Sequence, residues 1–141
     1  SGVDKVLWEE ANAKGKELGY FETLDKQFSI FGNLSHEEDL EFFEASMQQM
    51  VEDSDMLDLL FSHWKKGEID DLAELMNASF GEDEKMKAVL LTDRNQNWAY
   101  QIHKLMKGSG KIFIAVGAGH LGGDQSVQHY LKQLGYEAVR Q

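Results

Sequence analysis

The chain has 141 residues, 42% of them hydrophobic, so it can bury one core and we expect a single domain over residues 1–141. Its formal net charge of −11 disfavours nucleic-acid partners and anionic membrane surfaces, since their phosphate groups would be repelled. The absence of cysteine excludes disulfides, zinc–thiolate centres and thiol nucleophiles, and no segment approaches the roughly 20 apolar residues of a membrane span.

Apolar residues at helical spacing predict that the first half of the chain is mostly helix. This spacing gives one helix over Val3–Lys14 and a shorter one over Leu24–Phe31. Between them, Lys16–Phe21 is short, aromatic and preceded by glycine, which favours a strand. The sequence S-H-E-E from Ser35 is a capping-box signature, so we expect a long helix from Ser35 to about Trp64.

Three further helices are expected before the glycine-rich end of the chain. They are predicted over Ile69–Ala78, over Asp83–Leu91, and from a cap at Thr92 or Asp93 to near Gly108. The chain has no proline, so no residue of that kind interrupts long helices.

The last thirty residues predict a β-α-β unit. Lys111–Val116 is an apolar run rich in β-branched residues, as in a strand covered on both faces. An amphipathic helix over Asp124–Leu134 and a second strand over Tyr136–Val139 follow, and a right-handed crossover would make the two strands parallel. With Lys16–Phe21, this predicts an α/β fold that has a helix-rich middle and a small mixed sheet.

The turn after Lys111–Val116 has two interpretations. Gly117, Gly119 and Gly122 match G-x-G-x-x-G between a strand and a helix, which is the pattern of dinucleotide-binding sites. This signal is weak, because the acidic residue expected about 20 positions later is missing. The other interpretation is that the glycines support His120, which lies beyond the carboxyl end of the predicted strand, although a lone histidine is more often just hydrogen-bonded in a turn.

Two further polar groups favour a site at His120. N-capping by Thr92 or Asp93 leaves Arg94 and Asn95 unexplained, and Glu22 follows the predicted strand Lys16–Phe21. Taken alone, Glu22 is better explained as a solvated residue before a helix. We nevertheless expect four side chains to converge at one end of the sheet: Glu22, Arg94, Asn95 and His120. The remaining histidines are expected to be ordinary surface or core residues: His36, His63, His103 and His129.

An ordered set of motifs resembles the TraB/GumN family, which includes the Tiki metalloproteases and the pheromone-shutdown proteins. D-R-N at 93–95, G-K-I-F-I-A-V-G-A-G-H-L-G-G at 110–123 and L-G-Y-E-A-V at 134–139 resemble its C-terminal half. G-V-D at 2–4 and F-E-T-L-D-K-Q-F at 21–28 resemble its middle section. The resemblance implies a fold related to that of the Tiki proteins and a metal-dependent hydrolase that acts on peptides or proteins.

The resemblance also assigns roles to residues. His120 and Glu22 would hold a divalent ion such as Mn, Co or Zn, and Gly117 and Gly119 would support their loop. Glu22, Arg94 and Asn95 would take part in catalysis. The chemistry of its guanidinium suits Arg94 to stabilise an oxyanion or to orient a carboxylate. An extracytoplasmic location is favoured by the same resemblance.

The family site needs two G-x-x-H motifs, and the first is expected before Gly2. The resemblance therefore implies that this chain is about half of a family domain and is inactive as it stands. Such a half would leave an open sheet edge and exposed apolar surface, so we expect a homo-oligomer formed through Lys16–Phe21 or the helix Ser35–Trp64.

The second hypothesis is a noncatalytic interaction module. A methionine-rich helix with Met47, Met50 and Met56 would favour it, because methionine side chains adapt to varied partners. Helical spacing of methionines is, however, more often plain core packing.

Overall fold

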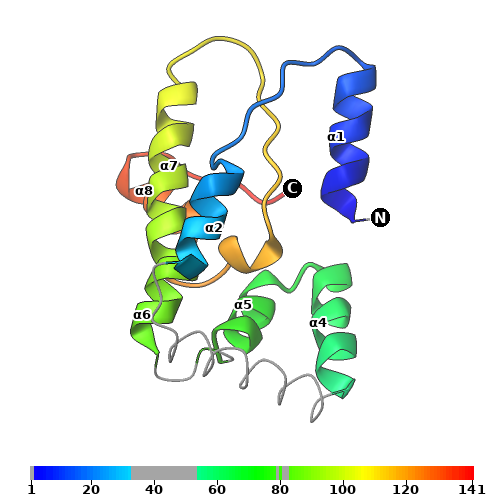
Figure 1. Cartoon of the computed structure of the whole chain (residues 1–141), viewed down its shortest axis with the longest axis vertical. Helices are drawn as coiled ribbons and strands as arrows, with labels where there is room; N and C mark the ends of the chain where they lie inside the picture. Colours follow the sequence, from blue (N-terminus) through cyan, green and yellow to red (C-terminus); the bar gives the residue numbers. More distant parts are fainter. Residues whose placement is uncertain (1, 33–53, 79, 81–82) are drawn as a thin grey trace.

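The computed structural model describes residues 2–32, 54–78, 80 and 83–141, and within these residues the chain consists of helices joined by coil (Figure 1). The elements are α1 (Val3–Ala13), α2 (Leu24–Gly32), α4 (Ser54–Lys66), α5 (Ile69–Ala78), α6 (Glu84–Lys87), the π-helix η1 (Ala88–Thr92), α7 (Asp93–Leu105), the 3-10 turn η2 (Ala118–His120) and α8 (Val127–Gln133).

The helical periodicity is confirmed for α1, α2 and α5, whose bounds lie within one residue of the predicted ranges. α4 agrees with the end of the predicted helix Ser35–Trp64. The earlier part of that prediction lies outside the described residues, as do the capping box, His36, Met47 and Met50.

The predicted α/β fold is wrong for the described residues, which form no strand and no sheet. The three predicted strands, Lys16–Phe21, Lys111–Val116 and Tyr136–Val139, are coil, so there is no parallel β-α-β unit. The backbone of 111–116 forms no hydrogen bond with the backbone of another described residue. Ile114 and Val116 pack instead against the core of α7 and α8, so the apolar run is partly buried without pairing as a strand.

α7 and α8 enclose the main apolar cluster of the described residues. α7 packs against α8, and Trp98, Ile102 and Val127 form a buried cluster between them. Phe21 and Leu131 pack against this cluster from the coil before α2 and from α8. Trp98 and Ile102 of α7 are therefore packed against side chains from the coil before α2 and from α8.

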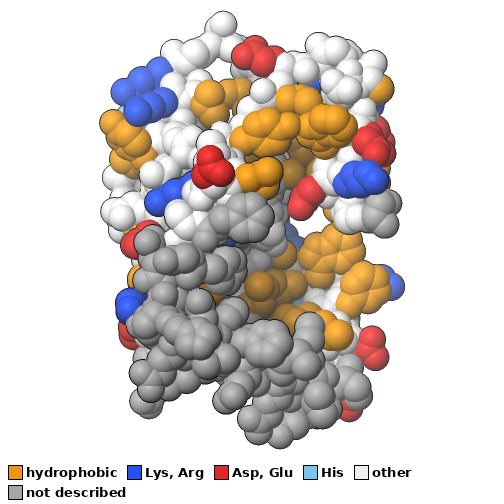
Figure 2. All heavy atoms as spheres, viewed as in Figure 1, with side chains coloured by type: hydrophobic (Ala, Val, Ile, Leu, Met, Phe, Trp, Pro, Cys, Tyr) orange, Lys and Arg blue, Asp and Glu red, His pale blue; other side chains and the backbone are white. Residues whose placement is uncertain are grey.

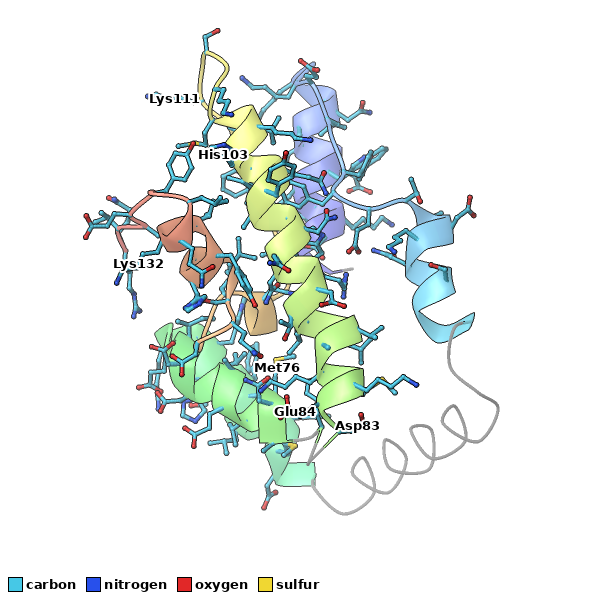
Figure 3. All side chains as sticks on the ribbon, turned by 90° about the vertical axis from the view of Figure 1, so that its left-hand side faces the viewer. Met76, Asp83, Glu84, His103, Lys111 and Lys132 are labelled. Carbon is cyan, nitrogen blue, oxygen red and sulfur yellow. The ribbon has the colours of Figure 1, made fainter. Side chains whose placement is uncertain are left out.

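α6, η1 and α7 form one continuous helix, in contrast to the break predicted at Thr92 or Asp93. Asp83 caps its start, because the Asp83 carboxylate accepts the N–H of Met86 at 2.8 Å; Figure 3 shows Asp83 and Glu84 at this end. Thr92 has helical φ and ψ and makes no capping bond; its hydroxyl donates to Gln125 Oε1 at 2.9 Å. The polar run from residue 92 thus begins mid-helix and faces the glycine-rich loop.

The glycine-rich loop lies directly on α5. A Cβ at Gly119 would lie 2.7 Å from the sulfur of Met76, which lies beside η2 in Figure 3. A Cβ at Gly122 would clash with the Ile69 carbonyl and lie 2.7 Å from the Ala73 Cβ. Glycine is therefore required at position 122 because the two backbones approach closely.

The surface carries several apolar side chains outside the core. On the face in Figure 2 they gather at the top, near α1 and the coil that follows it, where Trp8 Nε1 donates to the Tyr20 hydroxyl at 2.8 Å. Phe113 is 80% exposed. Within the described ranges, no helix is both long and apolar enough to cross a membrane.

We predict that Gly122→Ala lowers the free energy of unfolding by about 1–3 kcal/mol, because the new methyl group must push the loop away from α5. Gly19→Ala is the matched control, since a methyl group added there would meet no atom within 4 Å beyond its chain neighbours, and it should change stability by less than about 0.5 kcal/mol. Urea denaturation measures both; equal stability of the two variants would contradict the close approach.

Candidate functional site

A buried ion pair joins Glu22, in the bend before α2, to Arg94 in the first turn of α7. Arg94 Nε and Nη2 each donate to a different oxygen of the Glu22 carboxylate, both at 2.9 Å. The Glu22 side chain is 8% exposed and that of Arg94 20%. This two-point contact fixes the planes of both groups and is stronger than a single bond between neutral groups.

Trp98 lies one turn after Arg94 and completes the ion pair. Its indole Nε1 donates to Glu22 Oε1 at 3.0 Å, and the guanidinium carbon of Arg94 lies 4.8 Å from the centre of its ring. Phe21 stacks on the same ring with 5.7 Å between the ring centres. The indole therefore has both a hydrogen-bonding and a packing role.

His120, at the end of η2, is oriented by Asn95. Asn95 is only 2% exposed, and its amide nitrogen donates to the Gln125 carbonyl at 2.7 Å. Because that carbonyl can only accept, the amide oxygen of Asn95 must face His120 Nδ1, 2.6 Å away. Nδ1 must then carry the ring proton, which leaves the lone pair on Nε2.

Trp98 connects the two halves of the site. Its ring centre lies 4.5 Å from that of His120, at 45° between planes, and its nitrogen bonds Glu22 on the other side. The structure thus brings together Glu22, Arg94, Asn95 and His120 at the first turns of α7, through side chains and without the sheet edge that was expected to assemble them.

The pKa of the Glu22 carboxyl is lowered from its ordinary value. Burial alone would raise this pKa, but the hydrogen bond and the positive charge of Arg94 outweigh it. Donors on Trp98 and Gln27 lower it further. Glu22 is therefore ionised at neutral pH.

The pKa of His120 is lowered to about 4. Burial is the largest cause and the positive charge of Arg94 adds to it, whereas the negative charge of Glu22 opposes both only in part. His120 is therefore a neutral imidazole at pH 7.

The described residues meet the needs of a divalent metal only in part. His120 fits, because it is neutral and its Nε2 has no hydrogen-bond partner among the described residues. Glu22 does not fit, because donors from Arg94, Trp98 and Gln27 take up the lone pairs of its carboxylate. One protein ligand alone does not make a metal site.

The glycines around His120 have a packing role. Gly117 precedes η2 and lies against the His120 ring, while Gly119 and Gly122 allow contact with α5. The strand that a dinucleotide site requires before this turn is coil, and α8 begins only at Val127 after the cap Ser126. α8 thus starts later than the predicted Asp124–Leu134.

Two residues of the site were missed by sequence reasoning. Trp98 has the spacing of an apolar residue on the helix predicted from Thr92 or Asp93, and periodicity gives no signal for its hydrogen bond to Glu22. Gln125 contributes its backbone carbonyl to Asn95, a role that does not depend on its side-chain type. A tryptophan four residues after an arginine on a helix is a usable signal, since that spacing places both on one face.

We predict that Glu22→Gln costs about 2–3 kcal/mol of unfolding free energy, because Arg94 keeps its charge in a mostly buried place without a counter-charge. Glu9→Gln is the control: Glu9 pairs with Lys5 at 3.8 Å on the exposed face of α1 and should cost less than about 0.5 kcal/mol. Chemical denaturation at pH 7 measures both, and a small loss for Glu22→Gln would show that the pair contributes little.

A second prediction concerns pH. Unfolded His120 takes up a proton below about pH 6.5 but folded His120 only near pH 4, so stability is lost as pH falls between these values, by up to about 3 kcal/mol. His120→Gln, which cannot titrate, should show a shallower loss of stability between pH 6.5 and 4.5 than the wild type. A His120 pKa near 6.5 by NMR would contradict the prediction.

The comparisons with known proteins agree with the motifs. The sequence profile of the TraB/PrgY/gumN family matches residues 1–140. No curated protein and no solved structure matches the chain. Since the profile spans all but the last residue, the chain belongs to the TraB/PrgY/gumN family.

Proposed function

We propose that this chain carries part of the centre of a metal-dependent hydrolase that acts on peptides, with His120 as its key residue. The observation that supports this most strongly is the fixed tautomer of His120: Asn95 keeps the proton on Nδ1, 2.6 Å away, and leaves Nε2 with a lone pair. Histidines that bind metals are usually oriented in this way, by an acceptor at the other ring nitrogen.

The charges around His120 suit this role. A protonated imidazole cannot bind a cation or accept a proton, and the burial and Arg94 charge that lower its pKa to about 4 prevent protonation at pH 7. Arg94 orients the Glu22 carboxylate through two bonds, which is one of the two roles expected from its side-chain chemistry. Glu22 then acts as the counter-charge of Arg94.

A bound divalent ion would polarise the scissile carbonyl and activate a water molecule. Of the described site residues, His120 is the one that offers it a ligand. The sequence contains a single G-x-x-H, at residues 117–120, whereas the family site needs two. The proposal therefore places the further ligands on a segment outside this chain.

Ring-nitrogen NMR of the ¹⁵N-labelled chain tests the proposal. At pH 7 the His120 spectrum should show a neutral ring with its proton on Nδ1 and a lone pair on Nε2, and Asn95→Ala should let the other tautomer appear, because Nδ1 loses its acceptor. His129→Ala is the control, since that ring bonds Gln133 on α8. A wild-type His120 that carries its proton on Nε2, or on both ring nitrogens, at pH 7 would contradict the proposal.

A noncatalytic interaction module is the second candidate. It is favoured by the coil at 111–116, where Phe113 is 80% and Ile112 51% exposed and the backbone has no partner among the described residues. Such edges and apolar side chains favour pairing with another chain. In that case His120 would bind no ion, and the exposed side chains of 111–116 would contact another protein chain.

A further inference from the structure

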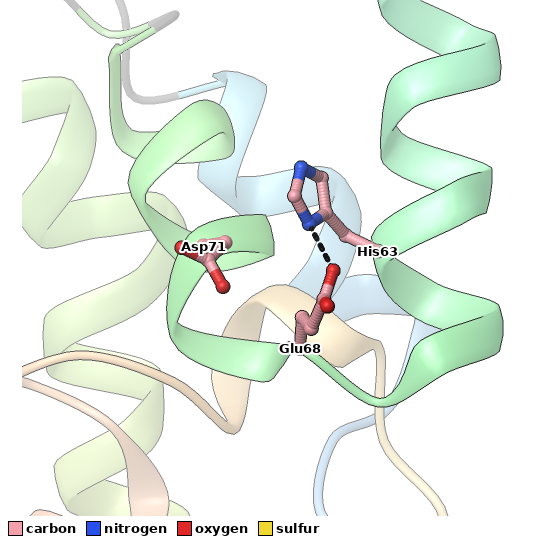
Figure 4. Close-up of side chains that lie close together, drawn as sticks. All are labelled: His63, Glu68 and Asp71. Atoms are coloured by element: carbon pink, nitrogen blue, oxygen red, sulfur yellow. Dashed lines mark hydrogen bonds and ion pairs between the residues drawn. The ribbon is translucent and has the colours of Figure 1, made fainter.

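A second group of metal-ligating side chains lies at the corner between α4 and α5. His63 comes from the last turn of α4, Glu68 from the connecting turn and Asp71 from the first turn of α5 (Figure 4). One ligand atom of each lies within 4.8 Å of the other two. The sequence predicted only an ordinary surface or core position for His63.

The backbone of the corner fixes two of these residues relative to each other. Gly67 has φ of 68°, its N–H donates to the Trp64 carbonyl at 3.1 Å, and the Glu68 N–H donates to the His63 carbonyl at 2.9 Å. These bonds define a Schellman motif, in which the side chains at positions 63 and 68 usually meet in an apolar contact. Here an imidazole and a carboxylate meet instead, with His63 Nδ1 2.8 Å from Glu68 Oε2.

Asp71 brings a third ligand to the same place. It lies in the first turn of α5, which begins directly after Glu68, and the Glu68 carbonyl accepts the first N–H bond of that helix from Leu72 at 3.1 Å. Its neighbour Asp70 is committed elsewhere, since one of its oxygens accepts the Gly123 N–H at 3.1 Å.

A simple ion-pair cluster explains only part of this arrangement. Lys66 lies 3.8 Å from Glu68 Oε2 but is 60% exposed on a long side chain, so it contributes little. The pairing of His63 with Glu68 gives no reason for a second carboxylate to converge on the imidazole.

We propose that His63, Glu68 and Asp71 bind one divalent cation, with Zn²⁺ as the best match to one imidazole and two carboxylates. Ligands on Zn²⁺ lie about 2.0–2.2 Å from the ion, so atoms now 2.8–4.8 Å apart reach it by side-chain rotation. Without the ion, His63 Nδ1 donates its proton to Glu68; on binding, Nδ1 would release that proton to solvent and Nε2 would take one up, so the ring stays neutral. The fourth position is left to water.

The bound ion would hold the corner together, because it joins α4 to the start of α5. α5 in turn supports the loop that carries His120, through Gly119 and Gly122 and through the bond from Gly123 to Asp70. The site does not depend on the proposed hydrolase function.

Calorimetric titration of the chelator-treated chain with Zn²⁺ tests the site. His63→Ala should weaken binding by at least about tenfold, since even a lost outer-shell contact costs 10- to 100-fold. Asp71→Asn should weaken it less, and the control His129→Ala should leave it unchanged. Zn²⁺ should also raise the thermal midpoint of the wild type but not that of His63→Ala.

His63→Gln serves if His63→Ala does not fold, because glutamine can still bond Glu68 but binds Zn²⁺ poorly. A wild-type chain without Zn²⁺ binding, or equal binding by the wild type and His63→Gln, would overturn the site. The His120→Ala variant should still bind Zn²⁺ at the corner between α4 and α5. A negative result for the proposed function at His120 can therefore be distinguished from a negative result for the metal site at His63.

Discussion

The ion pair between Glu22 and Arg94 is the interaction on which the rest of the site depends. It joins residues 72 positions apart and places the N-terminal coil against α7. Moving two charges out of water is costly, and the cost is offset only when the pair is geometrically complete. Here Trp98 supplies a further donor to the carboxylate, so the pair also sets the plane of the indole against which His120 packs.

The four polar residues were predicted from the sequence because their motifs occur in a family order, and the structure places them together. What the sequence could not give is the way they are connected. Trp98 has the spacing of a core residue, and it is buried like one. Periodicity therefore predicts its burial correctly but does not predict its hydrogen bond. The hydrogen bond of its ring nitrogen depends on where Glu22 arrives in space, which is not a local property.

The helices were predictable for a related reason. Periodicity at 3.6 residues reports a property of one segment, and α5 appears with the predicted bounds. A strand forms only where a neighbouring backbone can pair with it. An apolar run such as 111–116 predicts that the segment is buried, but it does not predict which element covers the segment. In the described chain, helices α7 and α8 cover one side of that run, through Ile114 and Val116.

The π-helix η1 joins α6 to α7, and it fixes the number of residues between them. Such a segment is related to a regular α-helix by one inserted residue. Removing one residue from Ala88–Thr92 would restore the α-helix and turn everything that precedes it by about 100° relative to α7. Asp83 and Met86 would then face away from the elements that they now contact, while Arg94 would keep its contact with Glu22. Within the family, sequences that retain the Arg-Asn pair should therefore tolerate substitutions in this segment far better than single-residue insertions or deletions.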